Sequence, residues 1–181
     1  MPDGDAALSL DLLPAVAREA IRARMEGREP RLPDGAAGEL SRPAPVFVTI
    51  RVDDELRGCV GSMEARFPDV VQETANRAVL AAFDDPRFPP LVSAELDAAT
   101  IEVSVLGPAE PVASLEGLDP SRYGVVVTVA GGRRGVLLPE IEGIDTAEQQ
   151  VALARRKGEI ADDEDASLAR FSVVKVGEPA V

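Results

Sequence analysis

The 181-residue sequence contains no histidine and no tryptophan, and Cys59 is its single cysteine. Without histidine, the chain cannot form a Ser–His or Cys–His catalytic pair and has no imidazole ligand for a metal. A zinc site would need several cysteine or histidine ligands. The acidic runs at 53–55 and 162–165 lack the spacing of a calcium-binding EF-hand loop. We therefore expect neither a bound metal nor a cofactor, and a fold that needs no disulfide bond.

Basic residues are also scarce, with 19 lysines and arginines against 32 aspartates and glutamates and a formal net charge of −13. This balance argues against nucleic-acid binding, because phosphate neutralisation needs clustered basic side chains. The sequence has no apolar run near the roughly 20 residues needed to cross a bilayer. The acidic start, Met1 to Asp5, does not resemble a signal peptide. We expect a cytoplasmic protein that does not associate with membranes.

Length and hydrophobic content favour one domain over residues 1–181, with its core between about 10 and 176. Residues 27–45 are rich in glycine and proline, so we expect a loop there that could join two subdomains. Hydrophobic periodicity predicts the remaining elements in the order helix, hairpin, helix, strand, hairpin, helix, strand. These predicted elements are a helix from about 13 to 21, strands at 46–52 and 56–63, a helix from 68 to 83, strands at 100–106, 124–129 and 136–138, a helix from 146 to 158 and a strand at 169–176.

The segment Leu56-Arg57-Gly58-Cys59-Val60-Gly61 places the thiol beside an arginine. Strand alternation predicts that Arg57 and Cys59 share a face, about 7 Å apart. A nearby cation favours the thiolate, which is the nucleophilic form of cysteine. Cys59 could equally be a small buried residue, with Gly58 and Gly61 permitting close packing around it. The residues alone leave both interpretations open.

Four segments of the chain, taken together, resemble motifs of the AMMECR domain family, whose prokaryotic members are also called AmmeMemoRadiSam system protein A. In chain order they are Leu56 to Ser62, Ala81 to Leu91, Ile101 to Leu106 and Arg133 to Pro139. The family often carries a cysteine, a Lys-Ala-Gly run and a tryptophan near its C-terminal end. This chain instead has Ala154 to Ile160 and no tryptophan.

The resemblance implies an α+β fold: an antiparallel β-sheet flanked by helices, with a smaller subdomain and a cleft between the two parts that the motifs face. Family members are encoded beside, or fused to, Memo-type and radical SAM proteins, which implies such proteins as partners. Any radical chemistry would belong to the partner, because this chain lacks the cysteines of an iron–sulfur cluster.

Two functions follow as hypotheses. In the first, the protein is a component of that pathway and binds a small anionic ligand, or a partner, near Arg57 and Cys59. The residues expected to form this binding site are Arg57, Gly58, Gly61, Asp84, Asp85 and Arg87. In the alternative, the protein is a thiol-dependent enzyme with Cys59 as nucleophile and Arg57 as its activating cation. Its base would be Glu102, Asp84 or Asp85. A structural interpretation competes with both, in which Asp85 and Arg87 form a salt bridge that holds their loop in place.

Overall fold

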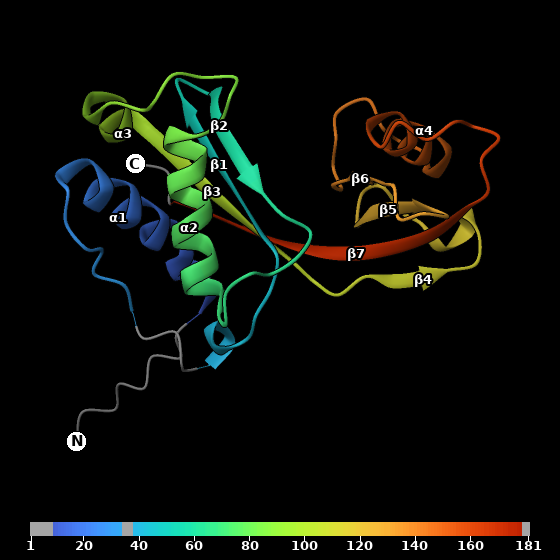
Figure 1. Ribbon diagram of the computed structural model, residues 1–181, viewed down its shortest axis with the longest axis horizontal. Coiled ribbons are helices and arrows are strands. Elements are labelled where there is room, and N and C mark those ends of the chain that lie inside the picture. Colours follow the sequence, from blue (N-terminus) through green and yellow to red (C-terminus); the bar gives the residue numbers. More distant parts are fainter. Residues whose placement is uncertain (1–8, 34–37, 179–181) are drawn as a thin grey trace. The chain divides into compact units, whose positions relative to one another are not determined.

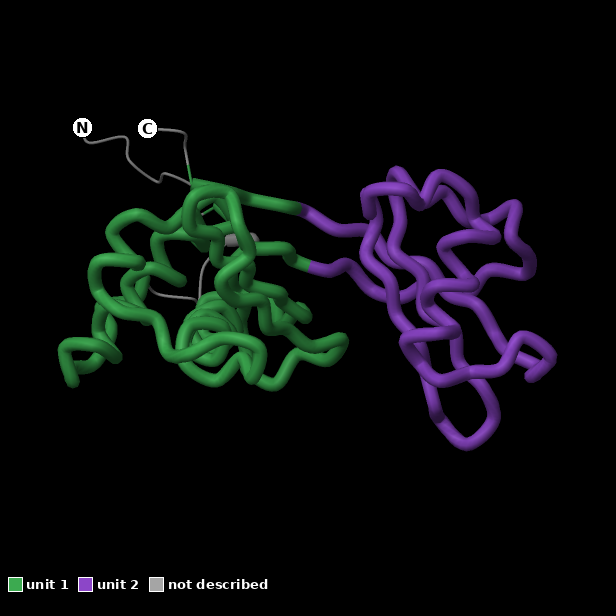
Figure 2. The backbone as a smooth tube through the Cα atoms, turned by 90° about the horizontal axis from the view of Figure 1, so that it is seen from above, with its two compact units in different colours: residues 1–105, 175–181 green, residues 106–174 purple. Residues whose placement is uncertain are grey.

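The computed structural model describes residues 9–33 and 38–178, and its chain divides into two compact units (Figure 2). Unit 1 comprises residues 1–105 and 175–181, and unit 2 comprises residues 106–174. Strands β3 (Ala99–Leu106) and β7 (Ala166–Gly177) carry the chain out of unit 1 and back. Part of the predicted loop at 27–45 lies outside the described residues, and the rest, with a 3-10 turn at Gly38–Ser41, belongs to unit 1.

Unit 1 contains an antiparallel sheet in which β1 (Val46–Val52) pairs with β2 (Glu55–Gly61) on one side and with β3 on the other. The end of β7 follows β3, and β2 forms an edge of the sheet. Two aspartates, Asp53 and Asp54, form the β1–β2 turn with positive φ angles of 51° and 63°. Aspartate tolerates this region better than most residues do. The predicted antiparallel α+β architecture is confirmed.

Helices cover one face of this sheet (Figure 1). The two longer helices of unit 1, α1 (Leu13–Glu26) and α2 (Val70–Phe83), pack against each other, and α2 also packs on β1 and β2. Pro14 lies in the first turn of α1, as predicted, and Asp69 caps α2 by accepting a hydrogen bond from the Gln72 N–H. The buried core between these helices and the sheet includes Leu13, Ala17, Ile21, Val46, Val48, Ile50, Val71, Ala78, Ile101 and Val103.

Unit 2 has its own sheet and its own core. Strand β5 (Tyr123–Val129) lies between β6 (Arg134–Leu137) and β7, and β4 (Glu110–Val112) pairs with β7. Helix α4 (Ala147–Lys157) packs on β5 and β6, above a core that includes Leu118, Val125, Val127, Leu137, Ala154 and Ile160. The predicted capping box of Thr146 and Gln149 is present, and the helix ends at Gly158 as predicted.

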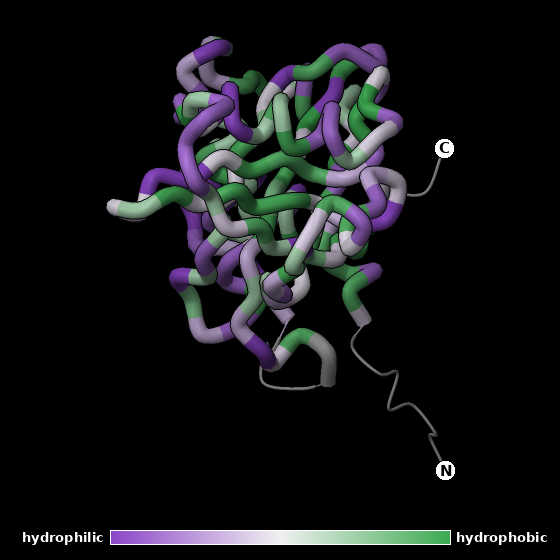
Figure 3. Tube along the Cα trace, turned by 90° about the vertical axis from the view of Figure 1, so that its right-hand side faces the viewer, coloured by the Kyte–Doolittle hydropathy of each residue, from purple (hydrophilic) through white to green (hydrophobic). Residues whose placement is uncertain are grey.

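The differences from the predicted elements include the short helix α3 (Ser93–Ala98), the strand β4 and the start of β7 at Ala166. Coloured by hydropathy, the trace shows continuous hydrophobic stretches alternating with hydrophilic ones (Figure 3). Within residues 9–33 and 38–178, the structure contains no helix of the length and apolarity that a membrane span requires.

Candidate functional site

The sheet face of unit 1 that lies opposite its helices carries polar side chains. We call it the open face and define it by Thr49, Arg51, Cys59, Thr100 and Glu102. In register, Thr49 lies opposite Cys59 on β2 and opposite Glu102 on β3, and Arg51 lies opposite Thr100. Residues directly opposite each other in an antiparallel pair project to the same face. Three adjacent strands therefore present a thiol, a hydroxyl and a carboxylate in one row.

Cys59 is half-buried within this row. Its Sγ lies 3.5 Å from the hydroxyl oxygen of Thr49. Two strand spacings, about 9.6 Å, separate the backbone of Cys59 from that of Glu102. A general base must approach its proton directly or through one water. The structure thus brings the two predicted residues to one face, with Thr49 between them, and their spacing suits contact with opposite ends of a ligand.

Arg57 takes a different direction from the one that strand alternation predicts. Ile50 of β1 pairs with Gly58 of β2, but the next residue, Arg51, pairs with Leu56. Arg57 has no partner on β1 and is therefore the extra residue of a β-bulge. A bulge interrupts the alternation of a strand and changes the direction of its side chain.

The Arg57 guanidinium is held by α3 and by the loop before it. Its Nε and Nη2 donate to the two carboxylate oxygens of Glu95 at 2.7 and 2.9 Å, and Nη1 donates to the Pro89 carbonyl at 2.9 Å. The side chain is only 14% exposed. These bonds from Arg57, together with one from the Val92 N–H, lower the pKa of Glu95. Arg57 thus joins β2 to α3.

Asp85 and Arg87 hold the outer edge of β2 at Cys59. One Asp85 carboxylate oxygen accepts a hydrogen bond from the Cys59 N–H at 2.9 Å, and Arg87 Nη2 donates to the Cys59 carbonyl at 3.3 Å. The two side chains also pair with each other, with Arg87 Nε and Nη2 donating to the Asp85 carboxylate at 3.0 and 2.8 Å. We call this arrangement the edge clasp. It satisfies backbone groups that an edge strand would otherwise leave exposed.

The two members of the edge clasp differ greatly in exposure. The Asp85 side chain is 3% exposed, whereas that of Arg87 is 55% exposed. The hydrogen bonds from Arg87, supported by the Cys59 N–H, hold the pKa of Asp85 well below its usual range, although burial acts in the opposite direction. The hydrogen bonds to Asp85 raise the pKa of Arg87. Arg87 therefore presents an exposed positive charge beside the backbone of Cys59.

The two glycines of the motif are required by close packing. A Cβ on Gly58 would lie 3.0 Å from the Ala81 carbonyl carbon and nearer still to its oxygen, so β2 could not approach α2 as closely. A Cβ on Gly61 would overlap the ring of Phe47, with 2.6 Å to Cδ2 and less to Cγ. Both glycines let β2 pack closely on its neighbours. They contribute to the site indirectly, because this packing holds the strand that carries Cys59.

Asp84, the remaining predicted residue, is exposed at the end of α2, where its N–H donates to the Leu80 carbonyl. Sequence reasoning overlooked Thr49, Arg51 and Thr100. The alternation of β1 already placed Thr49 and Arg51 opposite the apolar positions of that strand. Their relation to Cys59 and Glu102 depends on the pairing of three strands, which the sequence does not specify.

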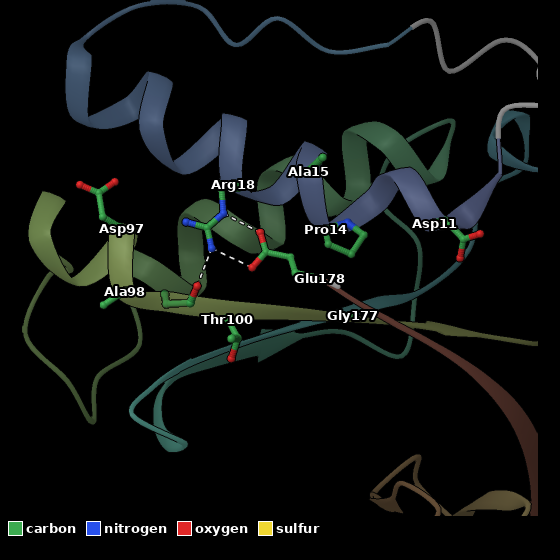
Figure 4. Close-up of a pocket in the computed structure, with 10 residues that line it drawn as sticks. Asp11, Pro14, Ala15, Arg18, Asp97, Ala98, Thr100, Gly177 and Glu178 are labelled. Atoms are coloured by element: carbon green, nitrogen blue, oxygen red, sulfur yellow. Dashed lines mark hydrogen bonds and ion pairs between the residues drawn. The ribbon is translucent and has the colours of Figure 1, made fainter. Parts of the chain in front are cut away.

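Two hollows lie on either side of the end of β7. One, of about 190 Å³, is on the open face and is lined by Thr49, Arg51, Thr100, Ile101, Glu102, Gly177 and Glu178. The other, of about 720 Å³, lies beside α1 and contains the paired side chains of Arg18 and Glu178 (Figure 4). Arg18 donates to the Glu178 carboxylate, with 2.7 Å from Nη2, and to the carbonyls of Leu96 and Ala99. Every guanidinium nitrogen of Arg18 is engaged within the protein, so we take this contact as structural.

Metal ligands do not gather at either hollow. Among the residues that the structure describes, no group of three or more cysteine, aspartate or glutamate side chains is arranged to hold a metal ion. The chemistry on the open face is that of a thiol, two hydroxyls and charged side chains. Such groups bind small polar ligands by hydrogen bonds and ion pairs.

Comparison with known proteins agrees with the resemblance of the four motifs. The chain is 44% identical over 145 residues to a protein of Thermotoga maritima, covering 78% of this chain and 83% of that protein. A protein of Clostridium acetobutylicum is 37% identical over 130 residues, which cover 72% of this chain but only 27% of that longer protein. The crystal structure of an uncharacterized protein from Pyrococcus horikoshii matches with a TM-score of 0.80 and 31% identity, covering 93% of this chain and 90% of that one. The AMMECR1 family model matches residues 14–176, and the chain therefore belongs to the AMMECR1 family.

Proposed function

We propose that this protein binds a small anionic ligand beside Cys59, where the outer edge of β2 meets the open face, as one component of a multi-protein pathway. The observation that carries the proposal is the edge clasp, because it holds the exposed Arg87 guanidinium next to the strand position of the thiol. Arg87 thus takes the part that the sequence suggested for Arg57, whose guanidinium is used by Glu95. Gly58 and Asp85 support the site by fixing the strand and the cation.

The Arg87 guanidinium retains binding capacity within the edge clasp. Its Nε and Nη2 make the hydrogen bonds to Asp85 and Cys59, which leaves Nη1 free of those bonds on a side chain that is 55% exposed. Guanidinium groups favour carboxylate and phosphate oxygens as acceptors. Arg87 is held in place and is 55% exposed, whereas the fixed side chains of Arg18 and Arg57 are 24% and 14% exposed, so Arg87 is the one of the three that can attract an anion from solvent.

Two alkylating reagents that differ in charge test this proposal. Iodoacetate is anionic and iodoacetamide is neutral, and both react with a cysteine thiolate. If the reagent carboxylate passes about 7 Å from the Arg87 guanidinium, the two charges interact in water by about 0.6 kcal/mol, which corresponds to about threefold in rate. We expect Arg87→Gln to lower the iodoacetate-to-iodoacetamide rate ratio at Cys59 about threefold. The neutral reagent corrects for any change in thiol exposure.

The control is Arg22→Gln, which removes an exposed arginine of α1 that pairs with Asp97. This variant should leave the rate ratio unchanged, and inorganic phosphate should slow iodoacetate more than iodoacetamide in the native sequence. An equal ratio in the Arg87→Gln and Arg22→Gln variants would refute the anion site.

The pathway part of the proposal rests on the family. The Clostridium acetobutylicum relative, of which the matching segment is 27%, supports a domain that works alongside other domains. The family resemblance names Memo-type and radical SAM proteins as partners. Co-purification of the full chain with each of these proteins tests this, with Arg87→Gln as the variant expected to bind less. Failure of the native chain to co-purify with either protein would contradict the partnership.

A thiol-dependent enzyme is the second candidate, and the row of Cys59, Thr49 and Glu102 favours it. With p-nitrophenyl acetate as a probe, the Cys59 thiolate would attack the acyl carbon. A sulfur–carbon bond would form, the ester C–O bond would break, and p-nitrophenolate would leave. Water would then attack the thioester, break the sulfur–carbon bond, release acetate and restore the thiol. Intact-mass measurement would detect the acetyl adduct, which should form more slowly in Thr49→Val and turn over more slowly in Glu102→Gln. A protein that forms no adduct is not an enzyme of this class.

A further inference from the structure

The hollow of about 190 Å³ on the open face has a distinctive pattern of charge. Thr49 pairs with Glu102 and Arg51 pairs with Thr100 across the neighbouring strands β1 and β3. Arg51 and Glu102 are therefore diagonal neighbours, and all four residues line the hollow. Diagonal neighbours in an antiparallel pair lie about 7–8 Å apart, within reach of long side chains. Both long side chains, of opposite charge, can therefore reach a ligand that lies above the hollow.

Neither charged side chain is committed to a strong partner. Arg51 is exposed, and Nη1 makes a long hydrogen bond of 3.4 Å to the Asp54 carbonyl. Glu102 is exposed, and no ion pair joins it to any residue within 9–33 and 38–178. Glu178 also lines the hollow, but its carboxylate is compensated by Arg18 and by the Ile101 N–H at 3.0 Å. The charges free to meet a ligand are thus one positive and one negative.

The residues at two strand positions, Gly177 and Thr100, leave the hollow unobstructed. A Cβ on Gly177 would meet nothing within 4 Å. The Thr100 side chain points away from Arg18, toward the other side of β3 (Figure 4). A space of about 190 Å³ corresponds to about six water molecules, which is well below the volume of a drug-sized site. Its occupant is therefore small.

We propose that this hollow binds a small zwitterion of the α-amino acid type. The guanidinium of Arg51 receives the carboxylate, the carboxylate of Glu102 receives the ammonium group, and the hydroxyls of Thr49 and Thr100 complete the hydrogen bonds. The remainder of the ligand extends along the row toward Cys59. The inference rests on the proposed function and adds a second subsite on the same face, in which Arg51 rather than Arg87 receives a carboxylate.

Binding is measured by the chemical-shift changes of the Thr100 and Gly177 amides in the full chain. The probes are glycine, which carries both charges, acetate, which carries only the negative charge, and methylammonium, which carries only the positive charge. We expect glycine to bind at least about tenfold more tightly than either single-charge probe. Arg51→Gln and Glu102→Gln should each weaken glycine binding about tenfold.

Gly177→Leu provides a variant that keeps all four polar side chains. The added side chain has room to enter the hollow, so the variant should fold and lose glycine binding, whereas Gly177→Ala should retain most of it. Equal binding of acetate and glycine, or unchanged glycine binding in Gly177→Leu, would overturn the inference. If glycine fails while the alkylation ratio still depends on Arg87, only the zwitterion inference fails. If that dependence is absent as well, the anion site fails with it.

Discussion

Replacement of Asp85 by asparagine is expected to loosen the edge clasp while preserving the size of the side chain. Asparagine can still accept the Cys59 N–H, but it loses the charge that pairs with Arg87 through bonds of 3.0 and 2.8 Å. Hydrogen bonds to charged groups contribute about 1.5–3 kcal/mol each. We therefore expect the variant to lose about 2–3 kcal/mol of local stability at this edge.

Amide hydrogen exchange of Cys59 measures this loss directly, because its N–H lies within the edge clasp. A loss of 2–3 kcal/mol corresponds to about 30- to 150-fold faster exchange. Asp84→Asn is the matched control, since Asp84 is adjacent, equally charged and exposed. The control should change stability by no more than about 0.5 kcal/mol. Equal exchange rates at Cys59 in the two variants would refute the role assigned to Asp85.

The pH dependence has a defined sign. The pKa of Asp85 in the folded state is held by Arg87 below its ordinary value of about 3.9. Its contribution is thus complete above that pH and is lost as the pH falls toward the folded value. After correction for intrinsic exchange rates, lowering the pH from about 5 to about 3 should reduce protection of the Cys59 amide about eightfold. Asp85→Asn should show no such loss.

Three further outcomes follow from the packing. Gly58→Ala should lower the free energy of unfolding by about 1–3 kcal/mol, because the added Cβ overlaps the α2 backbone. Gly177→Ala should be nearly neutral, and the urea midpoints of the two variants measure the difference. Glu178→Gln should destabilise unit 1 by about 1–3 kcal/mol through weaker pairing with Arg18, which faster amide exchange in α1 would reveal. Thr146→Ala should cost about 1 kcal/mol by removing the cap of α4, and an unchanged thermal midpoint of unit 2 would contradict it.

The longer helices and strands could be predicted from the sequence because their pattern of hydrophobic residues repeats several times. The alternation of β1 correctly predicted the buried positions Val46, Val48 and Ile50, and the capping box at Thr146 correctly predicted the start of α4. Helix α3 has six residues and β4 has three, too few for either period to emerge above chance. The register of these short elements depends on tertiary pairing.

The sequence suggested candidate residues for the site but did not predict which of them lie together. Cys59, Asp85 and Arg87 do meet, because the loop after α2 runs along the β2 edge. The bulge at Arg57 could not be foreseen, since it is a property of strand pairing that alternation assumes to be regular. Thr49 lay on the predicted polar face of its strand, and only the three-strand register connects it to Cys59 and Glu102.

The central claim is that Cys59 lies at an accessible site on a folded sheet, and its reaction with iodoacetamide tests this most directly. Because it is the only cysteine, the mass increase of the whole chain reports this one thiol. We predict that Cys59 reacts in the native protein at a rate that does not change with low concentrations of urea. A rate that rises with urea in proportion to the unfolded fraction would place the thiol in a closed core and contradict the account.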